Sequence, residues 1–313
     1  MNKAAFRPPV SPLLAFAWGI LAVSSGSILA RQALLYASPL VVSAYRLGVA
    51  TLILLPIVLI RSRRELRALR KELLLAVLAG VFLAFHFATW ISSLVYTTVA
   101  SSVVLVSTAP LWVALFAPLF LRESIRKGTV LGMLFALGGT VLVGISEICH
   151  WSIGGLQCPA WDEFFGAEAL WGDFLALLGS FLAAGYLLVG RFLRARYSLL
   201  TYIFIVYAIA ALVLLIWVGM TGLPVISYPP PAFGWFLALA ILPQLFGHST
   251  FNWALRYVPT ALVSIALLGE PLGSTLLAYL FLNETPSGLK MIGGGLILTG
   301  LVIALLYQKE DLE

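Results

Sequence analysis

Ten long apolar stretches dominate this sequence of 313 residues and restrict the structures that it can adopt. A bilayer core about 30 Å thick is crossed by a helix of roughly 20 apolar residues. Hydrophobic residues make up 61% of the chain and charged residues only 10%, whereas soluble domains carry about 25% charged residues. We therefore expect an all-α integral membrane protein with ten transmembrane helices and no room for a soluble catalytic domain. The predicted spans are Leu13–Leu35, Leu40–Ile60, Leu73–Leu94, Ala100–Phe120, Val130–Ile145, Ala169–Phe192, Thr201–Met220, Phe233–Leu255, Ala261–Leu282 and Leu289–Tyr307.

The positively charged residues fall almost entirely on one side of this predicted topology. With the N-terminus in the cytoplasm, the 19 Lys and Arg residues lie in cytoplasmic segments, except for Arg31 and Arg46 within spans and Lys290 outside. Cytoplasmic connections of membrane proteins are rich in Lys and Arg. The sequence thus predicts a multi-pass protein of the inner or plasma membrane with both termini cytoplasmic. The net charge of +6 reflects this topology and predicts no nucleic-acid partner.

Both cysteines, Cys149 and Cys158, lie in the longest connection that is predicted to be external, residues 147–168. Disulfides form and persist on oxidising faces. The sequence leaves a Cys149–Cys158 disulfide and two free thiols as equally weighted alternatives.

The second half of the chain repeats features of the first half at a shift of 161 residues, and near the starts of the halves at a shift of 153. The equivalent positions include Pro110 and Pro271, Glu123 and Glu284, Gly132 and Gly293, Gly139 and Gly300, and Trp18 and Trp171. We therefore divide the chain into a first five-helix repeat at 1–146, the external loop at 147–168, and a second five-helix repeat at 169–313. Because five is odd, the two repeats cross the bilayer in opposite orientations, as in many secondary transporters.

Pro110 and Pro271 are predicted helix breaks in the fourth and ninth spans. A proline within a helix removes one backbone hydrogen bond and bends the helix. Paired breaks at equivalent positions of two inverted repeats point to a binding site. The alternative is a packing kink with no ligand.

Polar side chains recur at helical spacing within several spans, and ionisable groups inside a membrane are functional candidates. Residues three or four positions apart share one face of a helix. We predict that these faces line a polar central cavity between the first, third, eighth and ninth spans. The candidate residues are Ser24 and Ser27; His86 and Trp90; Gln244, His248 and Asn252; and Glu270.

His86 and His248 occupy nearly equivalent repeat positions, and Glu270 directly precedes Pro271. An imidazole titrates near neutral pH, and a carboxyl group in a membrane can also hold a proton. These groups therefore predict coupling of transport to a proton gradient. In the alternative, the imidazoles form hydrogen bonds between helices and serve only packing.

Arg46 lies in the second span, about two turns from its external end. Two roles carry equal weight: the side chain snorkels to the interface, or it holds an anionic group of the substrate. Glu123 and Glu284 follow span ends, where capping and charge pairing are the favoured roles.

Several chemical signatures are missing from the sequence. It contains no Walker-type phosphate loop and no HExxH motif, and its three histidines lack the spacing of metal ligands. We therefore expect no cofactor, no metal and no enzymatic activity.

Segments distributed along the whole chain carry a family resemblance. They are Arg46, the run His86–Tyr96, Leu121-Arg122-Glu123 followed by Gly132 and Gly139, Leu282-Asn283-Glu284 followed by Gly293 and Gly300, and the segment Gly247–Tyr257. In these features the chain resembles the drug/metabolite transporter superfamily, specifically the ten-helix EamA-type permeases. The resemblance implies export or exchange of small metabolites, amino acids or drugs.

The sequence thus favours a secondary active transporter that exports or exchanges a small organic solute by alternating access. An uptake permease of the same fold is the nearest alternative. An intramembrane lipid-modifying enzyme is less favoured, since only His86 with Ser93 offers a base near a nucleophile. The expected partners are a small-molecule substrate and the lipid bilayer. A monomer can enclose the pathway, and the sequence leaves a homodimer open.

Overall fold

The ten predicted spans are all present in the structure. The computed structural model describes residues 8–152, 155–158, 166–282 and 286–309, and this part of the chain contains ten helical segments long and apolar enough to cross a membrane. The all-α class and the number of spans are therefore confirmed. The fifth span is longer than predicted, because its helix runs from Lys127 to Ile148.

The first repeat contains nine helical segments. They are α1 (Pro12–Val23), α2 (Gly26–Leu34), α3 (Pro39–Arg61), α4 (Arg63–Leu69), η1 (Arg70–Glu72), α5 (Leu73–Tyr96), α6 (Val99–Val106), α7 (Ala109–Phe120) and α8 (Lys127–Ile148). A short antiparallel hairpin follows, formed by β1 (His150–Ser152) and β2 (Gly155–Gln157). The second repeat consists of α10 (Ala167–Arg194), α11 (Leu199–Thr221), α12 (Pro230–Leu239), η2 (Ala240–His248), α13 (Ser249–Ala254), α14 (Thr260–Leu267), α15 (Glu270–Leu282) and α16 (Gly288–Lys309).

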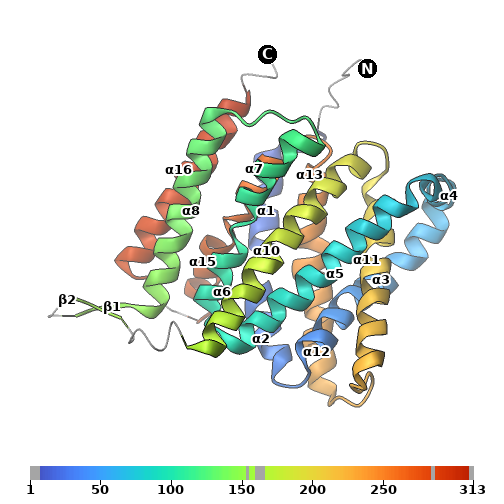
Figure 1. The fold of residues 1–313 in the computed structure, drawn as a ribbon, viewed down its shortest axis with the longest axis horizontal. Coiled ribbons are helices and arrows are strands. Elements are labelled where there is room, and N and C mark those ends of the chain that lie inside the picture. The colour runs from blue at the N-terminus through green and yellow to red at the C-terminus, as the bar shows by residue number, and fades with distance from the viewer. Residues whose placement is uncertain (1–7, 153–154, 159–165, 283–285, 310–313) are drawn as a thin grey trace.

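Helices of the two repeats pack against each other in pairs. The second span packs on the seventh (α3 on α11), and the fifth on the tenth (α8 on α16). The third span packs on the sixth (α5 on α10), and the equivalent pair, the eighth and first spans, also packs together (η2 on α1). Exchanging the repeats therefore maps these pairs onto one another. In Figure 1, α8 and α16 lie side by side at the left edge of the molecule.

The two faces of the bundle differ in what they carry. Helix α1 begins and α16 ends at the upper edge of Figure 1, which we call the terminal face. The β1–β2 hairpin projects at the opposite edge, the hairpin face. A disulfide joins Cys149 to Cys158 beside this hairpin.

Three of the spans are interrupted near their middle. The first divides at Ser24-Ser25, the fourth at Ser107-Thr108, and the ninth at Leu268-Gly269. Pro110 and Pro271 are each the second residue of the following helix, where a missing N–H leaves no intrahelical bond unmade. The breaks therefore lie just before the two prolines. The break in the first span was not predicted.

The contact between α8 and α16 depends on four glycines. A Cβ atom added to Gly132 would lie 2.5 Å from the carbonyl oxygen of Gly300, and one added to Gly139 would lie 2.5 Å from that of Gly293. The reciprocal contacts, from Gly300 and Gly293, are equally close at 2.4 and 2.8 Å. Glycine at these positions lets the two backbones touch, as in other membrane helix pairs.

Candidate functional site

A cavity of about 70 Å³ lies in the middle of the bundle, between the two repeats. The first repeat contributes residues from α1, α2, α3, α5, α6 and α7, and the second contributes residues from α10, η2, α13, α14 and α15. The predicted site residues that line it are Arg46, His86, Trp90, His248, Asn252, Glu270 and Pro110. We call it the central cavity.

Arg46 is 1% exposed, although it carries the charge of a guanidinium group. Its Nε donates a hydrogen bond of 2.8 Å to Oε1 of Gln244. Its Cζ lies 4.0 Å from the ring centroid of Phe87, a cation–π distance. Among the described residues, no carboxylate lies within 4.0 Å of the guanidinium. The snorkelling alternative is therefore wrong, because the side chain points into the bundle.

His86 is held by a hydrogen bond between helices. Its Nδ1 lies 2.9 Å from the carbonyl oxygen of Gly179 on α10, so this nitrogen carries a proton and donates a hydrogen bond to that oxygen. The His86 and Trp90 rings are nearly parallel, at 4° with centroids 6.3 Å apart. His248 approaches Phe87 edge-on, with centroids 5.3 Å apart. The four rings form an aromatic wall on one side of the central cavity.

Glu270 begins α15 at the break of the ninth span, and its half-buried side chain faces the central cavity. Arg46 lines the same cavity, so one enclosed space holds an acidic and a basic side chain. The backbone here is attached to the first span, because Ser24 Oγ donates to the Glu270 carbonyl (2.9 Å) and Ser274 Oγ donates to the Ser24 carbonyl (3.0 Å). The breaks of the first and ninth spans are thus bonded to each other.

Asn252 belongs to a chain of hydrogen bonds that crosses the second repeat. Its Oδ1 accepts from the Tyr186 hydroxyl at 2.7 Å, and its Nδ2 donates to the Tyr207 hydroxyl at 3.3 Å. The Tyr207 hydroxyl lies 3.3 Å from Ser249 Oγ, which donates to the backbone carbonyl of Gln244. The Gln244 side chain in turn binds Arg46.

Gln244 lies in a π-helical segment, η2. Such segments are rare and occur frequently at functional sites. Neither Tyr207 nor Ser249 was predicted from the sequence as a site residue. Ser249 follows Gln244 by five residues. This spacing places the two residues together only in a π-helical turn, which the sequence did not predict.

Four predicted site residues do not line the central cavity. Gln244 lies behind Arg46, and Ser24 is used by the contact with α15. Ser27 and Pro271 line a second cavity of about 350 Å³ near the hairpin face, the vestibule, together with Arg31 and Ser274. Gly26 and Glu270 line the central cavity, so directly adjacent residues line the two spaces.

Ser93 is not paired with His86. Its hydroxyl donates to the Trp90 carbonyl and lies 2.6 Å from the Ser102 hydroxyl. The arrangement of a nucleophile beside a base, which the sequence left open, is not formed.

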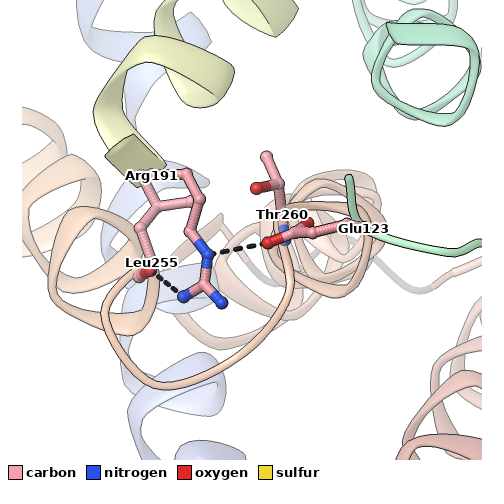
Figure 2. A network of polar contacts seen from close by, with 4 residues as sticks. All are labelled: Glu123, Arg191, Leu255 and Thr260. Carbon is pink, nitrogen blue, oxygen red and sulfur yellow. Dashed lines mark hydrogen bonds and ion pairs between the residues drawn. The ribbon is translucent and has the colours of Figure 1, made fainter. Parts of the chain in front are cut away.

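Glu123 forms a network of polar contacts at the terminal face, shown in Figure 2. One carboxylate oxygen accepts from Arg191 Nε at 2.7 Å, and the other accepts from the backbone N–H of Thr260 at 3.0 Å. Arg191 Nη1 also donates to the Leu255 carbonyl. The capping and pairing roles of Glu123 are confirmed. Its counterpart Glu284 lies outside the described residues.

The backbone before Glu123 has an unusual conformation. Arg122 has a φ of 56°, in the left-handed region that residues other than glycine rarely occupy. This turn ends α7 and directs Glu123 toward α10 and α14. A second carboxylate, Glu65, likewise accepts hydrogen bonds from the backbone and hydroxyl of Ser198 and from the hydroxyl of Thr201. Each network joins the first repeat to the second.

Comparison with known proteins identifies sequence relatives that match most of the chain. A family model described as the EamA-like transporter family matches residues 11–145 and again 170–306. An uncharacterized transporter of Archaeoglobus fulgidus is 26% identical over 234 residues, which cover 74% of this chain and 75% of that protein. The uncharacterized transporter YyaM of Bacillus subtilis is 24% identical over 289 residues, covering 88% and 87%.

A solved structure shares the fold. It is described only as a crystal structure of a protein, and it superposes with a TM-score of 0.74, 22% identity, and coverage of 96% of this chain and 98% of its own. At this identity the similarity shows the architecture alone.

Proposed function

This chain belongs to the EamA-like transporter family, and from that premise we propose that it exports or exchanges a small organic solute by alternating access. It is a multi-pass membrane transporter with ten spans. The proposed solutes are amino acids, metabolites or drugs, and the proposed location is the inner or plasma membrane with the terminal face in the cytoplasm. The carrier is secondary active, driven by a gradient.

The central cavity is the observation that carries this proposal. Both repeats line it, and it contains a buried Arg46, two imidazoles and Glu270. The breaks of the fourth and ninth spans lie at its wall, at Ser107 and Leu268. Unwound helices at the interface of two inverted repeats hold the substrate in other secondary transporters.

The two sides of the central cavity differ in this conformation. Toward the hairpin face it adjoins the vestibule. On both α2 and α15, one residue lines the central cavity and the next lines the vestibule. Toward the terminal face the Glu123 network ties the first repeat to Arg191 and Thr260 of the second. We assign this arrangement to the outward-facing side of the cycle, and the alternate state requires that the Glu123 network separate.

Glu270 is the proposed site of proton coupling. Glu270 and Arg46 line the same central cavity, so their opposite charges attract across it. A proton on Glu270 removes that interaction, so protonation and solute binding affect each other. His86 is a weaker candidate, because its hydrogen bond to Gly179 gives it a positioning role.

The experiment is exchange in proteoliposomes with a pooled panel of isotopically labelled amino acids and metabolites, with and without an imposed pH gradient. We expect the full chain to move at least one solute faster when the gradient is present. Glu270→Gln should abolish that acceleration, and Glu168→Gln, at an exposed site on the hairpin face, should retain it. If the wild-type protein moves no solute, the proposed function fails. Wild-type acceleration in the Glu270 variant would exclude Glu270 from coupling.

Inside-out and right-side-out vesicles distinguish export from the runner-up, an uptake permease of the same fold. Labelling of a single cysteine introduced at either terminus should occur only from the cytoplasmic side. Labelling of the two termini from opposite sides would contradict the proposed topology.

A further inference from the structure

Two hydrogen-bond donors in the central cavity lack an acceptor. They are Nη1 of Arg46 and Nε1 of Trp90, and the two residues are 1% and 5% exposed. A buried donor without a partner costs about 1–3 kcal/mol, and more when it is charged. Native proteins keep few such groups, and each requires an explanation.

The side chains that carry the two donors lie near each other beside α2. The Cζ atom of Arg46 is 6.0 Å from the ring centroid of Trp90. A Cβ atom placed on Gly26 would lie 3.9 Å from Arg46 Nη1 and 3.7 Å from Trp90 Cη2. Arg46 Nη1 and the benzo edge of the Trp90 indole therefore border the same space, which Gly26 leaves free of a side chain.

Neighbouring contacts fix both donors in place. Arg46 is held through Nε by Gln244 and lies over the Phe87 ring. Trp90 stacks against His86, which is held by the Gly179 carbonyl. A rigid pair of donors, one of them charged, is suited to a planar anionic acceptor.

We propose that Arg46 and Trp90 bind the carboxylate of the transported solute, an inference that rests on the proposed carrier function. Glu270 lines the same central cavity and restricts the rest of the ligand. Its negative charge disfavours a second carboxylate or a phosphate and favours a hydrogen-bond donor such as an ammonium or hydroxyl group. The ligand class is therefore a small monocarboxylate with a donor group near its other end.

Binding panels test this assignment on the purified full chain in nanodiscs. One panel holds small amino acids and hydroxy acids, a second holds the same molecules as primary carboxamides, and a third holds dicarboxylates. We expect members of the first panel to raise the melting temperature, and calorimetry to show binding at least about 10-fold weaker for the matched carboxamides. The dicarboxylates should bind no more tightly than the carboxamides.

Variants locate the binding. Arg46→Lys retains the charge but lacks Nη1, and Trp90→Phe retains the ring but lacks the indole N–H. Each should weaken binding of the carboxylate about 10-fold while leaving carboxamide binding unchanged. Arg64→Gln removes a positive charge at an exposed position of α4 and serves as the matched control. Because each variant is a small change inside a packed site, its melting temperature without ligand is recorded alongside.

Three results would overturn the assignment: no carboxylate binds the wild-type protein, the carboxamides bind equally well, or both variants bind carboxylates as the wild type does. Failure of the carrier function has a different signature, since the carboxylates would then bind through Arg46 and Trp90 but not cross the membrane of proteoliposomes.

Discussion

Arg46 and Arg191 are two arginines of one bundle with opposite surroundings. Arg191, at the terminal face, has a side chain that is 24% exposed, and it bonds both Glu123 and the Leu255 carbonyl. Arg46, in the central cavity, is 1% exposed and has one side-chain hydrogen-bond partner, the neutral Gln244. Arg46, whose charge is the more costly of the two to bury, thus has the less complete set of hydrogen-bond partners.

This difference separates two uses of charge in a membrane protein. In the Glu123 network both carboxylate oxygens and Nε and Nη1 of Arg191 have partners within the chain, so the network contributes to the packing of the repeats in this conformation. The central cavity leaves donors unmatched, so its charge is available to a ligand. Whether a charged group has hydrogen-bond partners within the chain therefore distinguishes structural from ligand-binding charges better than its burial does.

The largest expected effect comes from making the centre apolar. In the double variant Arg46→Met with Gln244→Leu, both partners of the buried hydrogen bond are replaced, which is often neutral or stabilising. We expect transport to fall about 100-fold, the equivalent of about 2.8 kcal/mol for one lost hydrogen bond from a charged donor to the ligand. The melting temperature should stay the same or rise. A protein that melts well below the wild type would show that Arg46 is structural.

The same treatment of the Glu123 network should have the opposite result. Glu123→Leu with Arg191→Met leaves the Thr260 N–H and the Leu255 carbonyl without side-chain partners. Because the pair is partly exposed, we expect a loss of about 1–2 kcal/mol, seen as a melting temperature lower by several degrees. Solute affinity should change less than about threefold. An unchanged melting temperature together with lost binding would reverse the comparison.

Tyr207→Phe has the smallest expected effect. It tests whether a polar group matters for transport because it lies near the central cavity or because it lacks a hydrogen-bond partner. Tyr207 is fully buried near the central cavity, but its hydroxyl already bonds Asn252 and Ser249. If only polar groups without partners in the chain bind the solute, the variant should lose about 1 kcal/mol of stability and keep transport within about twofold of wild type. Thermal melting and initial rates in proteoliposomes check both values. A loss of transport as large as that of the Arg46 variant would show that nearness to the central cavity, and not the lack of a hydrogen-bond partner, determines which residues transport requires.

Much of the fold could be predicted because lipid imposes it. Span length, the position of Lys and Arg, and the repeated Pro and Gly residues all follow from the bilayer and from duplication. The π-helix could not be predicted, because Pro243 and Gly247 within the eighth span fit an ordinary kinked helix equally well. Without it, Gln244 was placed on the cavity wall instead of behind Arg46.

The site was predicted in part for a related reason. Helical spacing places side chains on a face but does not show where a span unwinds. Ser24 and Ser27 were assigned to one continuous stripe, whereas the break at Ser24-Ser25 directs Ser24 to α15 and Ser27 to the vestibule. The partner of Glu123 was equally hidden, because Arg191 is distant in sequence and meets it only through the packing of the repeats.

The glycine contact between α8 and α16 has a consequence for motion. Gly132 touches Gly300, and Gly139 touches Gly293; exchanging the repeats turns each of these contacts into the other. When two inverted repeats exchange conformations, a contact that maps onto itself in this way has the same geometry before and after the exchange. In the proposed alternating-access cycle, the α8–α16 contact can therefore stay in place throughout, whereas the Glu123–Arg191 ion pair is expected to break and re-form once per cycle.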